Sequence, residues 1–299
     1  MIIDAHLHVW DLSRAHYPWL GPSLAPINRT VELEEVRPSL ERAGVTRVVL
    51  VQSADDPADT ANMMDVAEQH ADLVAGVVGW VPLSRPDLLA DALDGLRRSG
   101  RLVGIRNLIH DQADPSWITR PAQDEGLGLL AAADVPFDFV TADPAALALI
   151  PGISERHPDL RLVVDHLGKP PVGGSASERD HWRRLVVAAA ENPRVFAKVS
   201  GLYASSGDPS AWSAESIRPF IDDAVQIFGA DRLMFGGDWP ISVTAGGYER
   251  VTGALLDAIG TLSAAEREAV VAGTATRFYG LRTSVDLIPT QRGSGGRGE

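Results

Sequence analysis

The sequence has 299 residues, 45% of them hydrophobic, so it can form a large core and most of it is expected to fold. Its lack of cysteine excludes disulfides, thiolate metal sites and a cysteine nucleophile, as is typical of proteins of the reducing cytoplasm. A net charge of -13 disfavours nonspecific binding to nucleic acid or anionic membranes, and no signal peptide or stretch of transmembrane length is recognised, which predicts a cytoplasmic protein.

The first eight residues carry a candidate site at the end of a predicted strand. Apolar Ile2 and Ile3 lead into Asp4, His6 and His8. Alternate side chains of a strand share a face, so these three polar side chains are expected to project together. Two imidazoles and a carboxylate there are typical of a metal or proton-transfer site. The alternative is a hydrophobic strand that carries two surface histidines.

The loop that follows, residues 9–26, is long and rich in proline and aromatic residues, among them Tyr17 and Trp19. Long loops in compact domains are often functional, and aromatic side chains on them favour a lid over a ligand. Packing at the mouth of the scaffold is the alternative for these rings. A helix is then predicted from Thr30, as its N-cap, to Gly44.

From there, apolar and β-branched runs alternate with helical segments. The predicted strands are residues 45–52, 73–81, 102–106, 135–140, 160–166, 195–199 and 232–238. The predicted helices are residues 59–71, 86–99, 121–133, 144–157, 178–191, 214–228, 248–259 and 264–276. With the opening strand, this alternation predicts an α/β fold, a single-domain (β/α)8 TIM barrel over residues 1–282.

A doubly wound sheet is the alternative fold, but no glycine-rich dinucleotide turn follows the first strand. Residues 283–299 are expected to form a disordered C-terminal tail, because their end is rich in glycine and arginine and poor in apolar residues.

Polar residues gather at the carboxyl ends of the predicted strands, where barrel enzymes have their active sites. These residues are His6, His8, Gln52, Arg106, His166, Lys198 and Asp238. The strands themselves are almost entirely apolar, so random decoration would not usually give this distribution. His110 and Asp111 lie in the loop after the fourth strand, from which a substrate could be reached, but they are not counted among the expected site residues.

Three motifs carry a family resemblance: DxHxH at 4–8, DHLGKP at 165–170 and GGDWP at 236–240. In this order and on these elements they resemble the amidohydrolase superfamily, and within it the amidohydrolase-2 branch with its sugar lactonases, of the L-rhamnono- and L-fucono-lactonase type, and dicarboxylate lactonases. The YPW segment at 17–19, GIR at 104–106 and KVSG at 198–201 also fit that group. The resemblance covers residues 1–282.

The resemblance implies His6, His8 and Asp238 as metal ligands, with His166 nearby. Binuclear members of the superfamily bridge two metals with a lysine or glutamate on the fourth strand, where this chain has Arg106, and the fifth strand offers no histidine. A two-metal centre is therefore not expected. Members of the lactonase group work with one divalent ion, such as zinc or manganese, or without a metal.

For lactone hydrolysis the resemblance implies Asp238 as the general base that activates water, with His166 polarising the carbonyl or orienting the water. Arg106 and Lys198 would bind hydroxyls or a carboxylate of the substrate. Trp19 and Tyr17 would stack on its ring. Asp4 is at an alternate position of the same strand as the histidines but lies deeper in the barrel. We expect it equally to orient the residues of the site or to contact the metal or substrate directly.

Two other functions remain open from the sequence. A nonoxidative decarboxylase acting on an aromatic or unsaturated acid would use the same motifs of the branch, and a degenerate barrel could bind a small molecule without catalysis. A binder has no need of a water-activating carboxylate, which argues against the second. The expected partner is a small-molecule substrate, and the protein is expected to be a monomer or homodimer.

Overall fold

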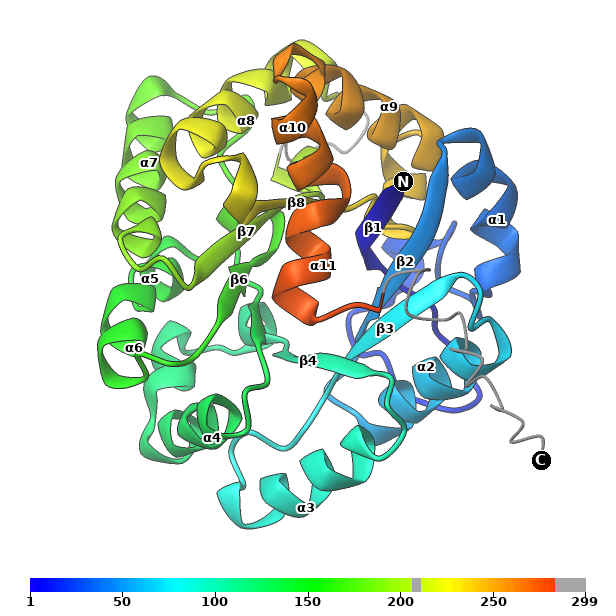
Figure 1. Ribbon diagram of the computed structural model, residues 1–299, viewed down its shortest axis with the longest axis vertical. Helices are drawn as coiled ribbons and strands as arrows, with labels where there is room; N and C mark the ends of the chain where they lie inside the picture. Colours follow the sequence, from blue (N-terminus) through cyan, green and yellow to red (C-terminus); the bar gives the residue numbers. More distant parts are fainter. Residues whose placement is uncertain (206–210, 283–299) are drawn as a thin grey trace, which may run out of the picture.

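The structure, a computed structural model, describes residues 1–205 and 211–282 and has eight parallel strands surrounded by helices (Figure 1). The strands pair in chain order from β1 to β8, which confirms the predicted (β/α)8 barrel. They are β1 (Ile2–Leu7), β2 (Val45–Val51), β3 (Val74–Gly79), β4 (Leu102–Asn107), β5 (Phe137–Phe139), β6 (Leu162–Val164), β7 (Val195–Val199) and β8 (Leu233–Phe235). The predicted tail, residues 283–299, lies outside the described residues.

The helices follow the predicted alternation with two interruptions. They are α1 (Leu33–Arg42), α2 (Pro57–Gln69), α3 (Pro86–Arg97), α4 (Pro121–Ala132), α5 (Pro144–Leu147), α6 (Ile150–Arg156), α7 (Ala176–Ala190), α8 (Ala214–Phe228), α9 (Tyr248–Ala258), α10 (Ala264–Glu268) and α11 (Thr274–Tyr279). The helix predicted over 144–157 is split because the Pro151 ring would clash with the carbonyl of Leu147, four residues earlier. A π-helical turn, Ala269–Gly273, interrupts the last predicted helix.

The prediction of Thr30 as a helix N-cap is wrong. The N-cap of α1 is Glu32, which forms a capping box with Glu35. The Thr30 hydroxyl is instead used in the preceding loop, where it donates to Asp11 and accepts from the backbone N–H of Leu12. Long-range loop contacts of this kind compete with local capping.

Helix α11 closes the end of the barrel opposite the polar strand ends. Its Phe278 and Tyr279 pack with apolar side chains of the barrel interior, such as Ile3 and Met234, in one buried cluster. Figure 1 shows α10 and α11 lying across the barrel opening. Within residues 1–205 and 211–282, no helix has the length and hydropathy needed to span a bilayer.

The barrel closes between β1 and the segment that follows β8. The backbone N–H of His8 donates to the carbonyl of Trp239 at 2.7 Å, and the N–H of Asp238 donates to the carbonyl of His6 at 2.8 Å. Gly236 allows this approach, because a Cβ atom at that position would lie 2.6 Å from the His6 Cβ. The seam therefore joins the first strand to the segment after the last strand, at the histidines and Asp238.

A bulge in β1 corrects one prediction about Asp4. Asp4 pairs with Val48 and Leu7 with Leu50, so β1 has one more residue than β2 between these pairs. An extra residue interrupts the alternation of side chains and turns Asp4 away from the face that carries His6 and His8. The Asp4 carboxylate accepts hydrogen bonds from Tyr248 of α9 at 2.7 Å and from the N–H of Gly237 at 2.9 Å. Asp4 thus supports the barrel seam.

Candidate active site

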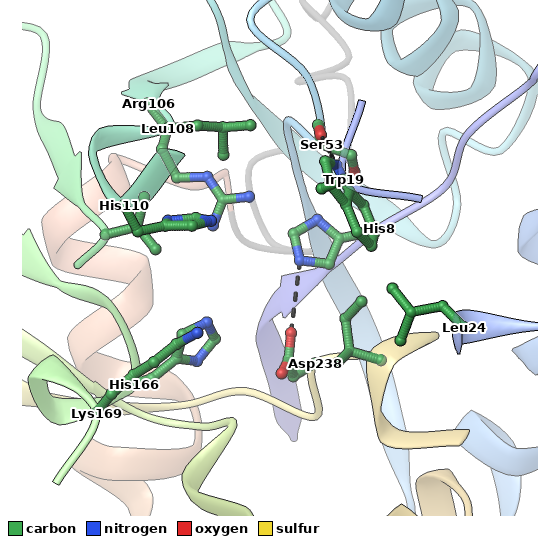
Figure 2. Close-up of a pocket in the computed structure, with 12 residues that line it drawn as sticks. His8, Trp19, Leu24, Ser53, Arg106, Leu108, His110, His166, Lys169 and Asp238 are labelled. Atoms are coloured by element: carbon green, nitrogen blue, oxygen red, sulfur yellow. Dashed lines mark hydrogen bonds and ion pairs between the residues drawn. The ribbon is translucent and has the colours of Figure 1, made fainter. Parts of the chain in front are cut away.

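A cavity of about 220 Å³ opens at the carboxyl ends of the strands (Figure 2). Residues from loops and strands distant in the sequence line it together. The lining residues are His8, Trp19, Leu24, Ser53, Arg106, Leu108, His110, Val140, His166, Lys169, Asp238 and Ile241. The sequence-predicted residues His8, Trp19, Arg106, His166 and Asp238 therefore meet in one place, as expected for a barrel enzyme.

His6, His8 and Asp238 form a buried group at the base of this cavity. Asp238 Oδ1 lies 3.8 Å from His6 Nε2 and 3.5 Å from His8 Nε2. Each residue offers one potential metal-ligand atom, and these three atoms all lie within 4.8 Å of one another. The barrel seam positions this group, since both histidines are on β1 and Asp238 is bonded to it through the backbone.

The hydrogen bonding of His8 makes this group suitable for a cation. His8 Nδ1 lies 2.7 Å from the carbonyl oxygen of Val51, which can only accept, so Nδ1 carries the hydrogen. In a neutral His8 the lone pair of Nε2 then faces the carboxylate of Asp238. Two electron-rich atoms at this separation require a proton or a metal ion between them, and the imidazole–carboxylate donor set fits one divalent ion such as zinc.

Asp238 is held as an ionised carboxylate. Its backbone has a positive φ of 54°, which lifts the side chain out of the strand direction. Burial favours the neutral acid, but the imidazoles of His166, His8 and His6 outweigh burial and hold the pKa of the Asp238 carboxyl well below its usual range. The Tyr203 hydroxyl donates to Asp238 Oδ2 at 2.8 Å, which leaves Oδ1 for the histidines. Sequence reasoning missed Tyr203, which lies in the 3-10 segment Leu202–Ser205 just after the KVSG motif, the one signal that could have pointed to it.

His166 lies in a left-handed turn after β6 rather than in the strand. The 3-10 segment Asp165–Gly168 has φ of 55° at His166 and 53° at Leu167, values that L-residues rarely adopt. His166 Nδ1 contacts the Ser200 hydroxyl at 2.9 Å, and its ring centroid is 4.5 Å from that of His6. Burial lowers the pKa of His166 to about 4, so the ring is neutral at pH 7.

A network of buried charges lies beneath His6. Lys198 Nζ is 2.6 Å from Asp138 and 3.1 Å from Asp165, and Asp165 also pairs with Arg106 Nη1 at 2.9 Å. His6 Nδ1 lies 3.4 Å from Asp165 and 3.1 Å from Lys198. Burial lowers the pKa of His6 well below its usual value and Lys198 acts in the same direction, although Asp165 opposes them. Burial therefore favours a neutral His6, as a metal ligand must be.

The position of Lys198 corrects its predicted role. Its side chain is fully buried, does not line the cavity and is saturated by carboxylates, so it has no surface for the substrate. Arg106 does line the cavity, but its terminal nitrogens already contact Asp165 and the carbonyl of Gln52. Neither cation is therefore free to clamp a substrate carboxylate.

The aromatic loop contributes one of its two predicted residues. Trp19 lines the cavity, with its indole N–H donating to the carbonyl of Ser53 at 2.7 Å. Tyr17 is buried away from the cavity and donates to Asp59 at 2.8 Å, which corrects its predicted contact with the substrate. His110 lines the cavity, as its loop position allowed, and so does Lys169, for which no role is predicted from the sequence.

Comparisons with known proteins agree with this geometry. A family model described as Amidohydrolase matches residues 3–281. The chain is 36% identical to an L-fucono-1,5-lactonase of Burkholderia ambifaria, over 82% of each protein. It is 32% identical to an L-fucono-1,5-lactonase of Burkholderia multivorans, over 95% of this chain and 97% of that protein. A crystal structure of an amidohydrolase from Burkholderia multivorans with bound zinc is 30% identical, with a TM-score of 0.88, and covers 94% of this chain and 100% of that one.

Proposed function

The chain belongs to the amidohydrolase family, and from that premise we propose that it is a lactonase that opens a sugar-derived 1,4- or 1,5-lactone with water. The observation that carries the proposal is the buried carboxylate of Asp238 at the base of the cavity, with its Oδ1 3.8 Å from His6 Nε2 and 3.5 Å from His8 Nε2. The named lactonase relatives, similar over most of their length, support the same reaction.

In the proposed mechanism Asp238 takes a proton from a water molecule as that water attacks the ester carbon. With the Ser200 hydroxyl donating to Nδ1, His166 presents its Nε2–H to the carbonyl oxygen, where negative charge develops. The bond between the carbonyl carbon and the ring oxygen then breaks. Protonated Asp238 returns its proton to the leaving ring oxygen, so the product is a hydroxy acid and Asp238 is again ionised.

His6, His8 and Asp238 are the residues that would hold one divalent ion, and the family is typically metal dependent. When bound, such an ion supplies Lewis acidity toward the carbonyl oxygen or the attacking water. Asp165 beside His6 and the Val51 carbonyl beside His8 orient the two rings for this purpose.

Chelation is expected to lower turnover by about tenfold or more, because it removes the Lewis acid of the site. Protein dialysed against chelator is assayed before and after addition of zinc or manganese, with metal content measured by elemental analysis. Restored turnover with about one ion per chain is the expected result. Full activity in protein that holds almost no metal would contradict it and leave the imidazoles to polarise the carbonyl themselves.

Tyr203→Phe is expected to lower kcat about tenfold or more, because it removes a hydrogen bond to a charged carboxylate whose orientation matters for proton transfer. Tyr17→Phe is the matched control: it removes the same hydroxyl from a buried tyrosine–aspartate pair outside the cavity. Equal kcat losses in both variants would show that Tyr203 acts on general stability and does not position Asp238.

A panel of sugar lactones with a pH indicator tests the function directly. Acid release from a lactone supports the proposal. Carbon dioxide release from an aromatic acid, with no lactone opened, would favour the decarboxylase. The absence of both reactions would favour a noncatalytic binder. The net charge of -13 supports a small-molecule substrate over nucleic acid or membrane, and we further propose a cytoplasmic monomer or homodimer.

A further inference from the structure

Of the 27 lysines and arginines in the sequence, only two are lysines, Lys169 and Lys198. All its other strong cations are arginines, yet both lysines are found at the active-site end of the barrel. Lys198 is fully buried in the carboxylate network. Lys169 lines the cavity, and the function proposed above gives it no task.

The left-handed turn after β6 aims Lys169 into the cavity. The positive φ values continue from His166 through Gly168 to Lys169, which has φ 51°, and the Lys169 N–H donates to the His166 carbonyl at 2.9 Å. In a turn with three residues per repeat, side chains at i and i+3 lie on the same side. His166 and Lys169 accordingly reach into the cavity side by side (Figure 2).

Surrounding packing fixes this unfavourable backbone. Trp182 of α7 donates its indole N–H to the Leu167 carbonyl at 2.7 Å, and Leu167 itself is fully buried. Gly168 packs so closely on α5 that a Cβ atom there would lie 2.9 Å from Leu147. Left-handed residues persist only where the rest of the fold determines them, and they concentrate at functional sites.

The Lys169 ammonium has no protein partner in the part of the chain that the structure describes. No hydrogen bond or ion pair joins it to residues 1–205 or 211–282, although Lys169 is partly buried. The charges that face it are the carboxylates of Asp238, Asp165 and Asp111 and the guanidinium of Arg106, none within bonding distance. A desolvated ammonium without an acceptor is unfavourable, so an acceptor on a ligand would be bound with a clear gain.

The walls of the cavity indicate which acceptor this is. Lys169 and His110 lie on one side of the cavity and form a polar wall, whereas Trp19 and Leu24 lie on the other side and form an apolar wall (Figure 2). His166 stands deeper, beside His6, where the ester carbonyl is expected. Lys169 is the more exposed of the two and so meets a part of the substrate farther from the reacting bond.

We propose that Lys169 is a substrate-binding residue whose ammonium holds ring hydroxyl oxygens of a neutral, polyhydroxylated lactone against the polar wall. The proposal rests on the lactonase function. Among the described residues that line the cavity, Lys169 is the one unpaired cation, and the carboxylate of Asp238 shares the space. That balance of protein charge disfavours a lactone carrying two carboxylates and suits hydroxyl groups, while the apolar wall takes the ring's C–H face.

Kinetics of Lys169→Met and Lys169→Arg test the proposal. Lys169→Met keeps the length of the side chain and removes its charge, and should raise KM for a hydroxylated lactone about 10- to 100-fold while kcat changes less than about threefold. Lys169→Arg should recover part of the loss. Arg184→Met, which removes an exposed cation on α7, is the matched control and should leave KM unchanged.

A substrate lacking one ring hydroxyl sharpens the test. If Lys169 holds that hydroxyl, the deoxy lactone has a higher KM with the wild type but the same KM as its parent with Lys169→Met. An unchanged KM in Lys169→Met, or a lower kcat with unchanged KM, would overturn the assignment while lactone turnover by the wild type upholds the function.

Amine labelling with mass spectrometry gives a readout without turnover. The chain has three amines: Lys198 is fully buried, whereas the N-terminus of Met1 is exposed and Lys169 faces the cavity. The sugar acid produced from the lactone should protect Lys169 but not the N-terminus, which is the internal control. Protection without turnover of any lactone would sink the lactonase function and retain the binding role; turnover without protection would overturn the binding role alone.

Discussion

Asp238→Asn is expected to lower kcat for lactone hydrolysis by about 10²- to 10⁴-fold, the usual contribution of a general base. Asparagine keeps the shape of the side chain and can still accept from the Tyr203 hydroxyl through its amide oxygen, but it cannot take a proton from water. Steady-state kinetics with a pH indicator measures the loss. The near-ultraviolet circular dichroism spectrum and the midpoint of thermal unfolding of the variant show whether the barrel is intact.

The pH profile of the wild type gives a second check on Asp238. The working form of the base is the carboxylate, which is present above its pKa and lost as pH falls through that pKa. Because the pKa of Asp238 is held below its usual range and that of His166 is lowered to about 4, kcat should be flat from about pH 5 to 8 and fall only in stronger acid. A rate that rises tenfold per pH unit through neutrality would contradict this assignment.

Lys198→Met is expected to lower the free energy of unfolding by about 3–5 kcal/mol, because it leaves Asp138 and Asp165 as buried carboxylates without their shared cation. Urea unfolding followed by fluorescence measures this change. Arg85→Met removes a cation from an exposed pair with Asp87 and should leave the unfolding midpoint unchanged.

A second substitution separates lost packing from lost charge. Adding Asp138→Asn to Lys198→Met removes one of the stranded carboxylates, so the double variant should be more stable than Lys198→Met alone. The Asp138 carboxyl accepts hydrogen bonds from Tyr279, which an asparagine oxygen can still accept. Equal stabilities of the single and double variants would show that Lys198 contributes through packing of its aliphatic chain.

The barrel and most of the site could be predicted because both depend on local patterns. β-branched runs alternating with helices predict the architecture, and the polar residues at the ends of six of the eight strands predict which side chains share one opening. His6, His8, Arg106, His166 and Asp238 were all found in this way, and the structure brings them together.

What could not be predicted depends on contacts between distant segments. The bulge that turns Asp4 toward α9 is set by the pairing of β1 with β2, which strict alternation within one strand cannot reveal. The left-handed turn that presents Lys169 is fixed by Trp182 and the packing of α5. The role of Lys198 depends on two buried carboxylates, Asp138 on β5 and Asp165 just after β6, and a lysine at a strand end gives no sign of them in the sequence.

The seam between β1 and the end of β8 has a consequence for biosynthesis. Both histidines leave the ribosome with the first strand, whereas Asp238 and the Trp239 carbonyl that bonds to His8 emerge more than two hundred residues later. Closing so long a loop is slow. The entropic cost of its closure is offset only by the contacts that form when the last strand docks. A nascent fragment that ends before β8 lacks Asp238 and the Trp239 carbonyl and therefore cannot assemble the site.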